Sequence, residues 1–215
     1  FGAIEGIILY DAIARVRPDF KVLANFILSY IPNLKNVFIP VNPFTDKPEW
    51  GSSIGGIKEA MAHISKGCGL GVFPAGEVSR YNGNKYPEDI DWSVTIAKLA
   101  KKSKVPVIPF YFDGTNSKTF YRLAKMHSML GTAMLLRELY NKRNQHFTIK
   151  IGKPILPSDF EVYDDFKKMS AYMRARSYAL EANIHNEETK RFDTKLEPLP
   201  PPRKSNMLLN ELDNI

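Results

Sequence analysis

The sequence predicts an α/β domain with a mostly parallel sheet flanked by helices. Short apolar segments rich in β-branched residues alternate with segments of helical periodicity, which favours parallel strands joined by crossover helices. The length of 215 residues suits a single domain with a sizeable core. We assign that domain to residues 1–186. Residues 187–215 contain prolines at positions 198 and 200–202, and we interpret them as a stiff linker or the start of a further domain.

Five strands are predicted from apolar runs bounded by turn residues. The run "VFIPV" is apolar and β-branched, "GLGVF" leads into a Pro-Gly turn, and "HFTIKIG" alternates between apolar and polar residues. Prolines in "VPVIPFYF" place that strand at an end or an edge of the sheet. The predicted strands cover residues 20–24, 37–41, 69–73, 105–112 and 146–152.

Helices are predicted between these strands. The first has Ile4, Ile7 and Ile8 at helical spacing, Gly67 is a stop signal for the second, and Asp91 is the expected N-cap of the third. The predicted helices cover residues 4–16, 52–66, 92–102, 116–141 (one helix or two) and 164–183, and residues 26–31 are predicted as a helical turn.

The chain carries a formal net charge of +7, which favours anionic partners such as lipid headgroups, an acidic carrier protein or nucleic acid. No recognised nucleic-acid-binding motif accompanies this charge, so we do not expect nucleic acid as a partner. Cys68 is the single cysteine, so no internal disulfide forms and a reducing compartment is favoured. No apolar run of about 18 residues and no signal-peptide pattern is present, and we expect a cytoplasmic location.

The stretch "FPAGEVSR" comes directly after a predicted strand and concentrates groups that can contact a ligand. Pro74 and Gly76 predict a tight, exposed turn. Ligands of parallel α/β sheets gather at the carboxyl ends of the strands. We therefore expect Glu77 and Arg80 above a cleft, and Ser79 donating a hydrogen bond to a substrate oxygen. The alternative is a polar loop in which Glu77 and Arg80 pair with each other.

The same stretch resembles the third conserved block of the glycerolipid acyltransferase family, usually Phe-Pro-Glu-Gly-Thr-Arg-Ser, with Phe73, Pro74, Gly76 and Ser79 in register. "NVFIPVNPF" resembles the second block and "VPVIPF" the fourth, in the family's order and with its spacing. The resemblance covers residues 1–155 and is closest to bacterial members linked to amino-acid-containing lipids of the ornithine type. It implies that these third-block residues contact the substrate.

The family's chemistry needs a histidine and an acid, His-x4-Asp, in the first block. The histidine acts as general base on the acceptor hydroxyl, which attacks a thioester, and the acid orients the imidazole. No histidine of this sequence has an acid at that spacing. Because "FGAIEG" resembles the segment after the histidine in relatives, we expect the histidine directly before Phe1, with Glu5 in the position of the acid. The chain without that histidine is expected to be inactive. The alternative for Glu5 is an exposed acid in the first turn of a helix.

The sequence departs from the family where glycerol phosphate is held. Asn42 and Pro43 replace the usual arginine of the second block, and Ala75 and Val78 replace the usual glutamate and arginine of the third. Loss of an arginine removes charge-assisted hydrogen bonds to phosphate. We therefore expect Asn42 to contact an acceptor other than lysophosphatidic acid. An acceptor with a hydroxy-acyl amide and an amino-acid headgroup suits the added acid and base of the third block better.

These observations and the resemblance predict an O-acyltransferase of membrane lipid synthesis. It would move a fatty acyl group from an acyl-carrier-protein or acyl-CoA thioester to the hydroxyl of a lyso-lipid acceptor. No metal and no tightly bound cofactor are expected. The segment at residues 116–141 mixes apolar with basic residues, which suits peripheral binding to the inner face of the cytoplasmic membrane. The alternative for this segment is a core helix with one solvated face.

Two other classes of protein remain open. "GSSIG" matches the G-x-S-x-G pattern of serine hydrolases, with Ser53 as the nucleophile. The polar segment before it is not the strand that a nucleophile elbow requires, and Ser52 or Ser53 also suits a helix N-cap. A non-catalytic lipid-binding module is the second alternative, because the residues present lack the general base.

Overall fold

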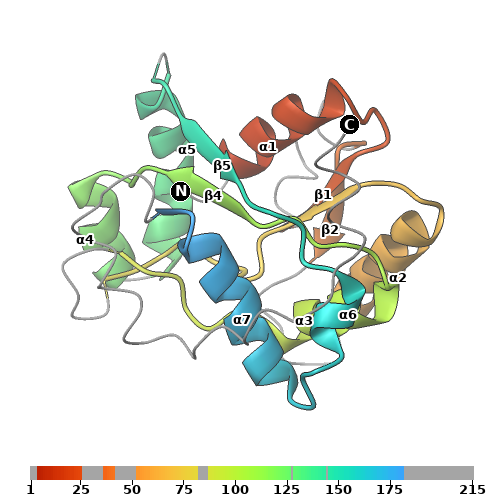
Figure 1. Cartoon of the computed structure of the whole chain (residues 1–215). Helices are drawn as coiled ribbons and strands as arrows, with labels where there is room; N and C mark the ends of the chain where they lie inside the picture. Colours follow the sequence, from red (N-terminus) through yellow and green to blue (C-terminus); the bar gives the residue numbers. More distant parts are fainter. Residues whose placement is uncertain are drawn as a thin grey trace.

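The structure is a computed structural model that describes residues 4–25, 36–41, 52–81, 87–126, 128–143 and 145–181 (Figure 1). Asn42, the predicted turn at residues 26–31 and the predicted linker at residues 187–215 lie outside these ranges. The helices are α1 (Ile4–Ala14), α2 (Ser52–Ser65), α3 (Val94–Ser103), α4 (Lys118–Met126), α5 (Ser128–Asn141), α6 (Pro157–Phe160) and α7 (Phe166–Tyr178). The strands are β1 (Lys21–Asn25), β2 (Phe38–Val41), β3 (Leu70–Val72), β4 (Phe110–Asp113) and β5 (Thr148–Ile151).

The first sheet consists of three parallel strands in the order β2–β1–β3. Side chains alternate between the two faces of a strand. Val22 and Phe38 accordingly lie in a buried cluster with Leu9 of α1, whereas Leu23 and Ile39 lie in a second cluster with residues of α2, α3 and α7. Helices therefore cover both faces of this sheet, as the sequence predicts for an α/β domain.

The second sheet corrects the predicted topology. β4 pairs antiparallel with β5, so that Phe110 lies opposite Ile151, and among the described residues only β1, β2 and β3 pair in parallel. β4 begins at Phe110 rather than at residue 105. Pro106 and Pro109 lack the N–H group that a strand ladder needs, and Val107 before β4 forms only an isolated bridge.

Several helix bounds also differ from the prediction. Ser93, not Asp91, caps α3, because its side chain accepts a hydrogen bond from the N–H of Thr95 at 3.2 Å. The α7 helix begins two residues later than predicted, because Asp165 caps it. The segment predicted as one helix or two forms α4 and α5, which pack together on the opposite side from α2 in the view of Figure 1. The short α6 is not predicted from the sequence.

Candidate active site

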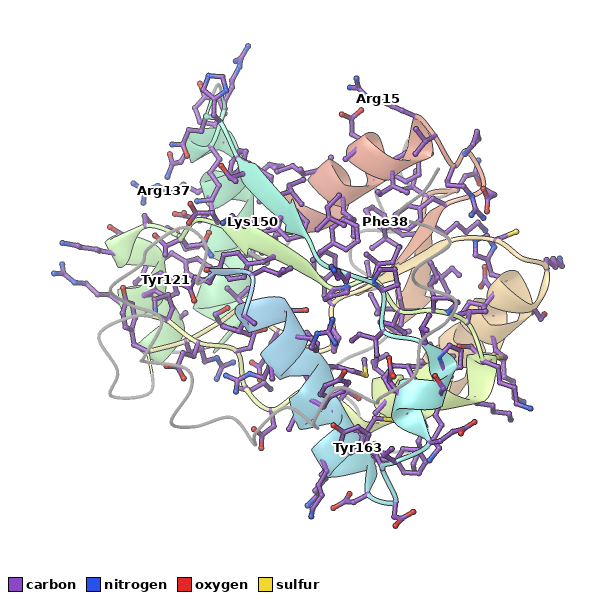
Figure 2. All side chains as sticks on the ribbon, in the orientation of Figure 1. Arg15, Phe38, Tyr121, Arg137, Lys150 and Tyr163 are labelled. Atoms are coloured by element: carbon purple, nitrogen blue, oxygen red, sulfur yellow. The ribbon has the colours of Figure 1, made fainter. Side chains whose placement is uncertain are left out.

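Phe73 lies directly after β3, where α1, β2 and β4 meet. Its ring centroid is 6.1 Å from that of Phe112 on β4. A Cβ added at Gly6 of α1 would lie 3.8 Å from Phe73 Cε2 and 3.5 Å from Phe38 Cε1 on β2. Figure 2 shows Phe38 in the interior of the molecule. Phe110, the last residue of the segment that resembles the fourth block, packs against the same buried cluster as Phe73. The segments that resemble the second, third and fourth family blocks are thus packed around one aromatic cluster, with the first turn of α1 beside it.

The chain turns sharply after Phe73, which confirms the predicted turn. The N–H of Gly76 donates to the carbonyl oxygen of Phe73 at 3.0 Å, and Gly76 has a φ of 71°, in the region that favours glycine. The carbonyl oxygen of Pro74 accepts a hydrogen bond from the N–H of Ser93 at 2.9 Å. The turn is therefore tied to the start of α3.

Glu77 and Arg80 pair with each other, as in the polar-loop alternative. Arg80 Nη2 donates to Glu77 Oε2, and the two side chains are 48% and 37% exposed for Arg80 and Glu77 respectively. Exposed ion pairs contribute only about 0–1 kcal/mol, because both charges interact well with water when apart. The pair can therefore open at little free-energy cost, and contact of either side chain with a substrate stays a prediction.

Ser79 is hydrogen-bonded to Asp89. Ser79 Oγ donates to Asp89 Oδ1 at 2.6 Å, and Trp92 Nε1 donates to Asp89 Oδ2 at 3.0 Å. Two residues of α7 hold the main chain of Asp89: its N–H donates to Tyr178 Oη and its carbonyl oxygen accepts from Arg174 Nη2, both at 3.1 Å. In this arrangement Asp89 accepts the Ser79 hydrogen, and donation from Ser79 to a substrate oxygen stays a prediction.

Glu5 lies in the first turn of α1, next to the glycine that packs on Phe73. It is half-buried and its Oε2 is buried, which differs from the exposed acid of the alternative interpretation. Burial is the main reason that the pKa of Tyr121 is raised to about 12, and the charge of Glu5 also raises it. The ring of Tyr121 meets that of Tyr81 edge-on at 4.9 Å. Glu5, Tyr121 and Tyr81 therefore lie in one region.

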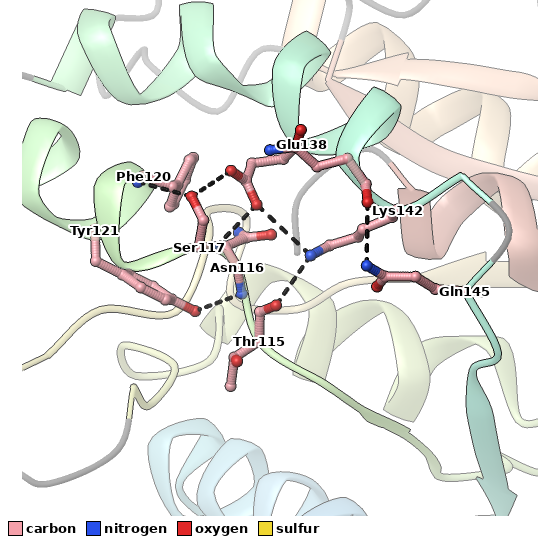
Figure 3. Close-up of polar contacts among 9 residues, drawn as sticks. Thr115, Asn116, Ser117, Phe120, Tyr121, Glu138, Lys142 and Gln145 are labelled. Carbon is pink, nitrogen blue, oxygen red and sulfur yellow. Dashed lines mark hydrogen bonds and ion pairs between the residues drawn. The ribbon is translucent and has the colours of Figure 1, made fainter.

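A second polar network joins the loop after β4 to α5 (Figure 3). Ser117 Oγ donates to Glu138 Oε1 at 2.5 Å, and Lys142 Nζ lies 3.6 Å from Glu138 Oε2 and donates to the carbonyl oxygen of Thr115 at 2.9 Å. Burial by itself would raise the pKa of Glu138, but hydrogen bonds from Ser117 and the charge of Lys142 outweigh it and lower this pKa. Glu138 is therefore a buried carboxylate in an ion pair.

The α4–α5 region has the character of a core element with a solvated face. Phe120 is buried, whereas Arg122 and Arg137 are exposed, and Figure 2 shows Arg137 at the periphery. In the described part of the chain, no helix combines the length and hydrophobicity that a membrane span needs. Nor is any group of His, Cys, Asp and Glu side chains placed there to bind a metal ion. Binding of this region to a membrane surface stays a prediction.

Sequence reasoning misses Asp89 and Tyr121 as neighbours of the site. Asp89 lies ten positions after Ser79, and no local motif connects the two residues. Tyr121 belongs to a segment whose sequence indicates only an amphipathic helix. A buried tyrosine hydroxyl usually has a hydrogen-bond partner, but the sequence does not show that Tyr121 is buried. Two other predicted sites are not placed by the structure: Asn42 lies outside the described residues, as does the side chain of Ser53. The β2 strand ends at Val41 and does not lead directly into Ser53.

Comparison with known proteins identifies the family. An acyltransferase family model matches residues 1–187. A lyso-glycine lipid O-acyltransferase of Phocaeicola vulgatus is 30% identical over 144 residues, which cover 64% of this chain and 49% of that protein. A lyso-glycine lipid O-acyltransferase of Bacteroides thetaiotaomicron is 31% identical over 166 residues, which cover 74% of this chain and 59% of that protein. The chain thus spans about half the length of the curated relatives it matches.

No solved structure matches the chain. The relatives are named for a glycine lipid, so the expected link to lipids of the ornithine type stays a prediction. The resemblance drawn from three sequence blocks is confirmed by the family match over most of the chain. This chain belongs to the glycerolipid-type acyltransferase family.

Proposed function

We propose that this chain is the catalytic domain of an O-acyltransferase that acylates the hydroxyl of a lyso-amino-acid lipid, with a lyso-glycine lipid as the first candidate. The observation that carries the proposal is the packing of Gly6 against Phe73, which brings Glu5 beside the third-block turn. Two relatives named as lyso-glycine lipid O-acyltransferases support a lipid acceptor of this kind.

The proposed reaction starts with the histidine expected directly before Phe1. Its imidazole removes the proton of the acceptor hydroxyl, and the carboxylate of Glu5 orients the imidazole and stabilises its charged form. The hydroxyl oxygen attacks the carbonyl carbon of an acyl-carrier-protein or acyl-CoA thioester. The C–S bond then breaks, and the imidazolium returns its proton to the leaving thiolate. This scheme uses no metal and no bound cofactor.

The weak pairing of Glu77 and Arg80 supports a role in acceptor binding. Because the pair is exposed, a headgroup carboxylate can replace Glu77 as the partner of Arg80. We propose that Asn42 and the turn at residues 73–76 also contact the acceptor. The net charge of +7 and the exposed arginines of the α4–α5 region support binding to anionic lipids at the inner face of the cytoplasmic membrane.

The test is acyl transfer by the full-length protein to an N-(3-hydroxyacyl)glycine and to lysophosphatidic acid, with acyl-CoA and acyl-carrier protein as donors. We expect the glycine acceptor to be acylated and lysophosphatidic acid to react poorly. Robust acylation of lysophosphatidic acid would overturn the proposed acceptor. Release of free fatty acid that is lost in Ser53→Ala would overturn acyl transfer in favour of a hydrolase, and absence of both reactions would favour a lipid-binding module.

The role of Glu5 has its own matched pair of variants. Glu5→Gln is expected to lower kcat about 100-fold, because the amide orients the imidazole poorly and does not stabilise its charge. Asp11→Asn makes the same chemical change in α1, at an exposed acid paired with Arg15, and should leave kcat unchanged. Equal activities of the two variants would contradict the role of Glu5. An Asn-His pair encoded directly before Phe1 would support the expected base.

A further inference from the structure

The direction of the hydrogen bond between Ser79 and Asp89 restricts what Ser79 can offer a ligand. A carboxylate accepts hydrogen bonds and donates none, so the hydroxyl hydrogen of Ser79 points to Asp89 Oδ1, 2.6 Å away. The other carboxylate oxygen is used as well, because it accepts from Trp92 Nε1 at 3.0 Å. Both oxygens of Asp89 are therefore engaged by donors, which suits a carboxylate.

Contacts from other elements hold Asp89 in this orientation. Tyr178 and Arg174 of α7 bind its N–H and carbonyl oxygen. The preceding residue, Glu88, exchanges two main-chain hydrogen bonds with Arg80, at 2.8 and 2.9 Å. The segment that carries Asp89 is thus fixed to the segment that carries Ser79 and to α7. Turning the Asp89 side chain away would break its hydrogen bonds with Ser79 and Trp92 together, and turning the Ser79 hydroxyl alone would cost the hydrogen bond to Asp89 Oδ1.

Ser79 Oγ can therefore still accept a hydrogen bond, but it has no hydrogen left to donate. A serine hydroxyl has one hydrogen and two lone pairs. The hydrogen is taken, Ser79 is half-buried, and no other hydrogen bond to its Oγ is found among the described residues. A ligand group that meets Ser79 gains a hydrogen bond only if it brings an N–H or O–H.

We propose that Asp89 makes Ser79 a selector for a hydrogen-bond donor, and that this donor is the amide N–H of an N-acylated amino-acid acceptor. The inference rests on the proposed function and names the acceptor class more closely. The reacting hydroxyl of the acceptor has a single hydrogen, which it must direct to the general base. In an acceptor with a glycine headgroup, whose carboxylate donates no hydrogen bond, the amide N–H is the donor that remains. Asp89 acts through Ser79, so it is a positioning residue.

A Ser79 oxygen that can only accept a hydrogen bond distinguishes between two classes of acceptor lipid. An N-acyl amino-acid lipid carries an N–H between its acyl chain and its headgroup, and that group matches Ser79. A glycerophosphate acceptor has an ester at that place, whose oxygens only accept, so it leaves Ser79 without a hydrogen bond. A lost hydrogen bond at a partly buried group lowers affinity by a few-fold to about tenfold.

The test compares binding of an N-acylglycine with binding of the ester analogue in which the N–H is replaced by oxygen. Dissociation constants are measured by calorimetry on the full-length protein with no acyl donor present. We expect the amide to bind about fivefold more tightly than the ester. In Asp89→Asn the amide oxygen faces Trp92, the NH2 group donates to Ser79, and the Ser79 hydrogen is released. The preference should then vanish or reverse, and in Ser79→Ala it should vanish.

Matched controls separate this role from a structural one. Asp91→Asn repeats the change at an exposed acid two positions away, and Ser65→Ala removes a hydroxyl at the end of α2; both should keep the preference of about fivefold. Equal binding of amide and ester by the wild type would overturn the proposal, as would an unchanged preference in folded Asp89→Asn or Ser79→Ala. Because binding is measured without turnover, an amide preference without acyl transfer would uphold this inference while the proposed function fails.

Discussion

Ser79–Asp89 and Ser117–Glu138 are two serine–carboxylate pairs with hydrogen bonds of 2.6 and 2.5 Å, in very different surroundings. Glu138 is 2% exposed and forms an ion pair with Lys142, which is 6% exposed. Asp89 is half-buried, and Arg174 beside it donates to its main chain. One carboxylate is thus neutralised within the molecule, whereas the other leaves a serine oxygen able to accept a hydrogen bond from a ligand.

The difference indicates two roles for the same chemical pair. A buried ion pair is stable only while both partners are present, because an isolated charge in the interior is strongly disfavoured. The Ser117–Glu138 pair therefore holds α5 to the loop after β4. The Ser79–Asp89 pair lies beside the third-block turn, where we propose that the acceptor binds. This division between a structural pair and a binding pair can be tested by substitution.

The largest effect is expected from Lys142→Met, which leaves Glu138 buried without its cation. Removal of one partner of a buried ion pair costs about 3–5 kcal/mol in the free energy of unfolding. Urea unfolding at pH 7 measures this change. Lys118→Met, at an exposed lysine of α4, is the matched control and should change stability by less than about 0.5 kcal/mol. Similar losses in the two variants would contradict the structural role of the pair.

The pH dependence of the Lys142→Met effect gives a second check. The pKa of Glu138 is lowered in the folded protein, so its contribution is complete above the unfolded value of about 4.3 and is lost as the pH falls through the lower folded value. A protonated Glu138 needs no cation. The difference in stability between wild type and Lys142→Met should therefore shrink below about pH 4. A difference that stays constant as the pH falls below this value would show that the loss of stability does not come from the charge of Glu138.

A smaller effect is expected when the two serines are compared directly. Ser117→Ala removes the hydrogen bond to Glu138 and the one that Ser117 Oγ accepts from the N–H of Phe120, and should lower the free energy of unfolding by about 2 kcal/mol. Ser79→Ala should lower it by less than about 1 kcal/mol. The amide-to-ester affinity ratio should show the opposite order, unchanged in Ser117→Ala and lost in Ser79→Ala. If the two variants changed the free energy of unfolding and the affinity ratio equally, the division between a structural pair and a binding pair would be wrong.

A smaller effect than that of Ser117→Ala is expected from Tyr178→Phe, which removes the oxygen that accepts from the N–H of Asp89. Loss of the contact between the Tyr178 hydroxyl and Asp89 should lower the free energy of unfolding by about 1 kcal/mol, measured by urea unfolding. Tyr140→Phe is the matched control, because Tyr140 is 72% exposed. A change in Tyr140→Phe as large as that in Tyr178→Phe would show that the bond to Asp89 contributes nothing specific.

In the candidate site, the sequence predicts the local backbone turn better than the contacts between side chains that are distant in the chain. The turn at Pro74 and Gly76 is predictable, because proline and glycine restrict the backbone locally. The pairing of Glu77 with Arg80 is one of two stated alternatives, since residues three positions apart lie within reach of each other. The partner of Ser79 is not predictable, because Asp89 is brought to it by main-chain pairing of Arg80 with Glu88 and by contacts with α7.

The sequence by itself determined the α/β alternation, most strand and helix positions, the turn after Phe73 and the family, because periodicity, turn residues and motif order are properties of short segments. Tertiary structure decided that β4 pairs antiparallel with β5, that the first turn of α1 packs on Phe73, and that Ser79 gives its hydrogen to Asp89. These outcomes depend on contacts between residues distant in the chain, and no local pattern specifies which distant partner a buried or polar group meets.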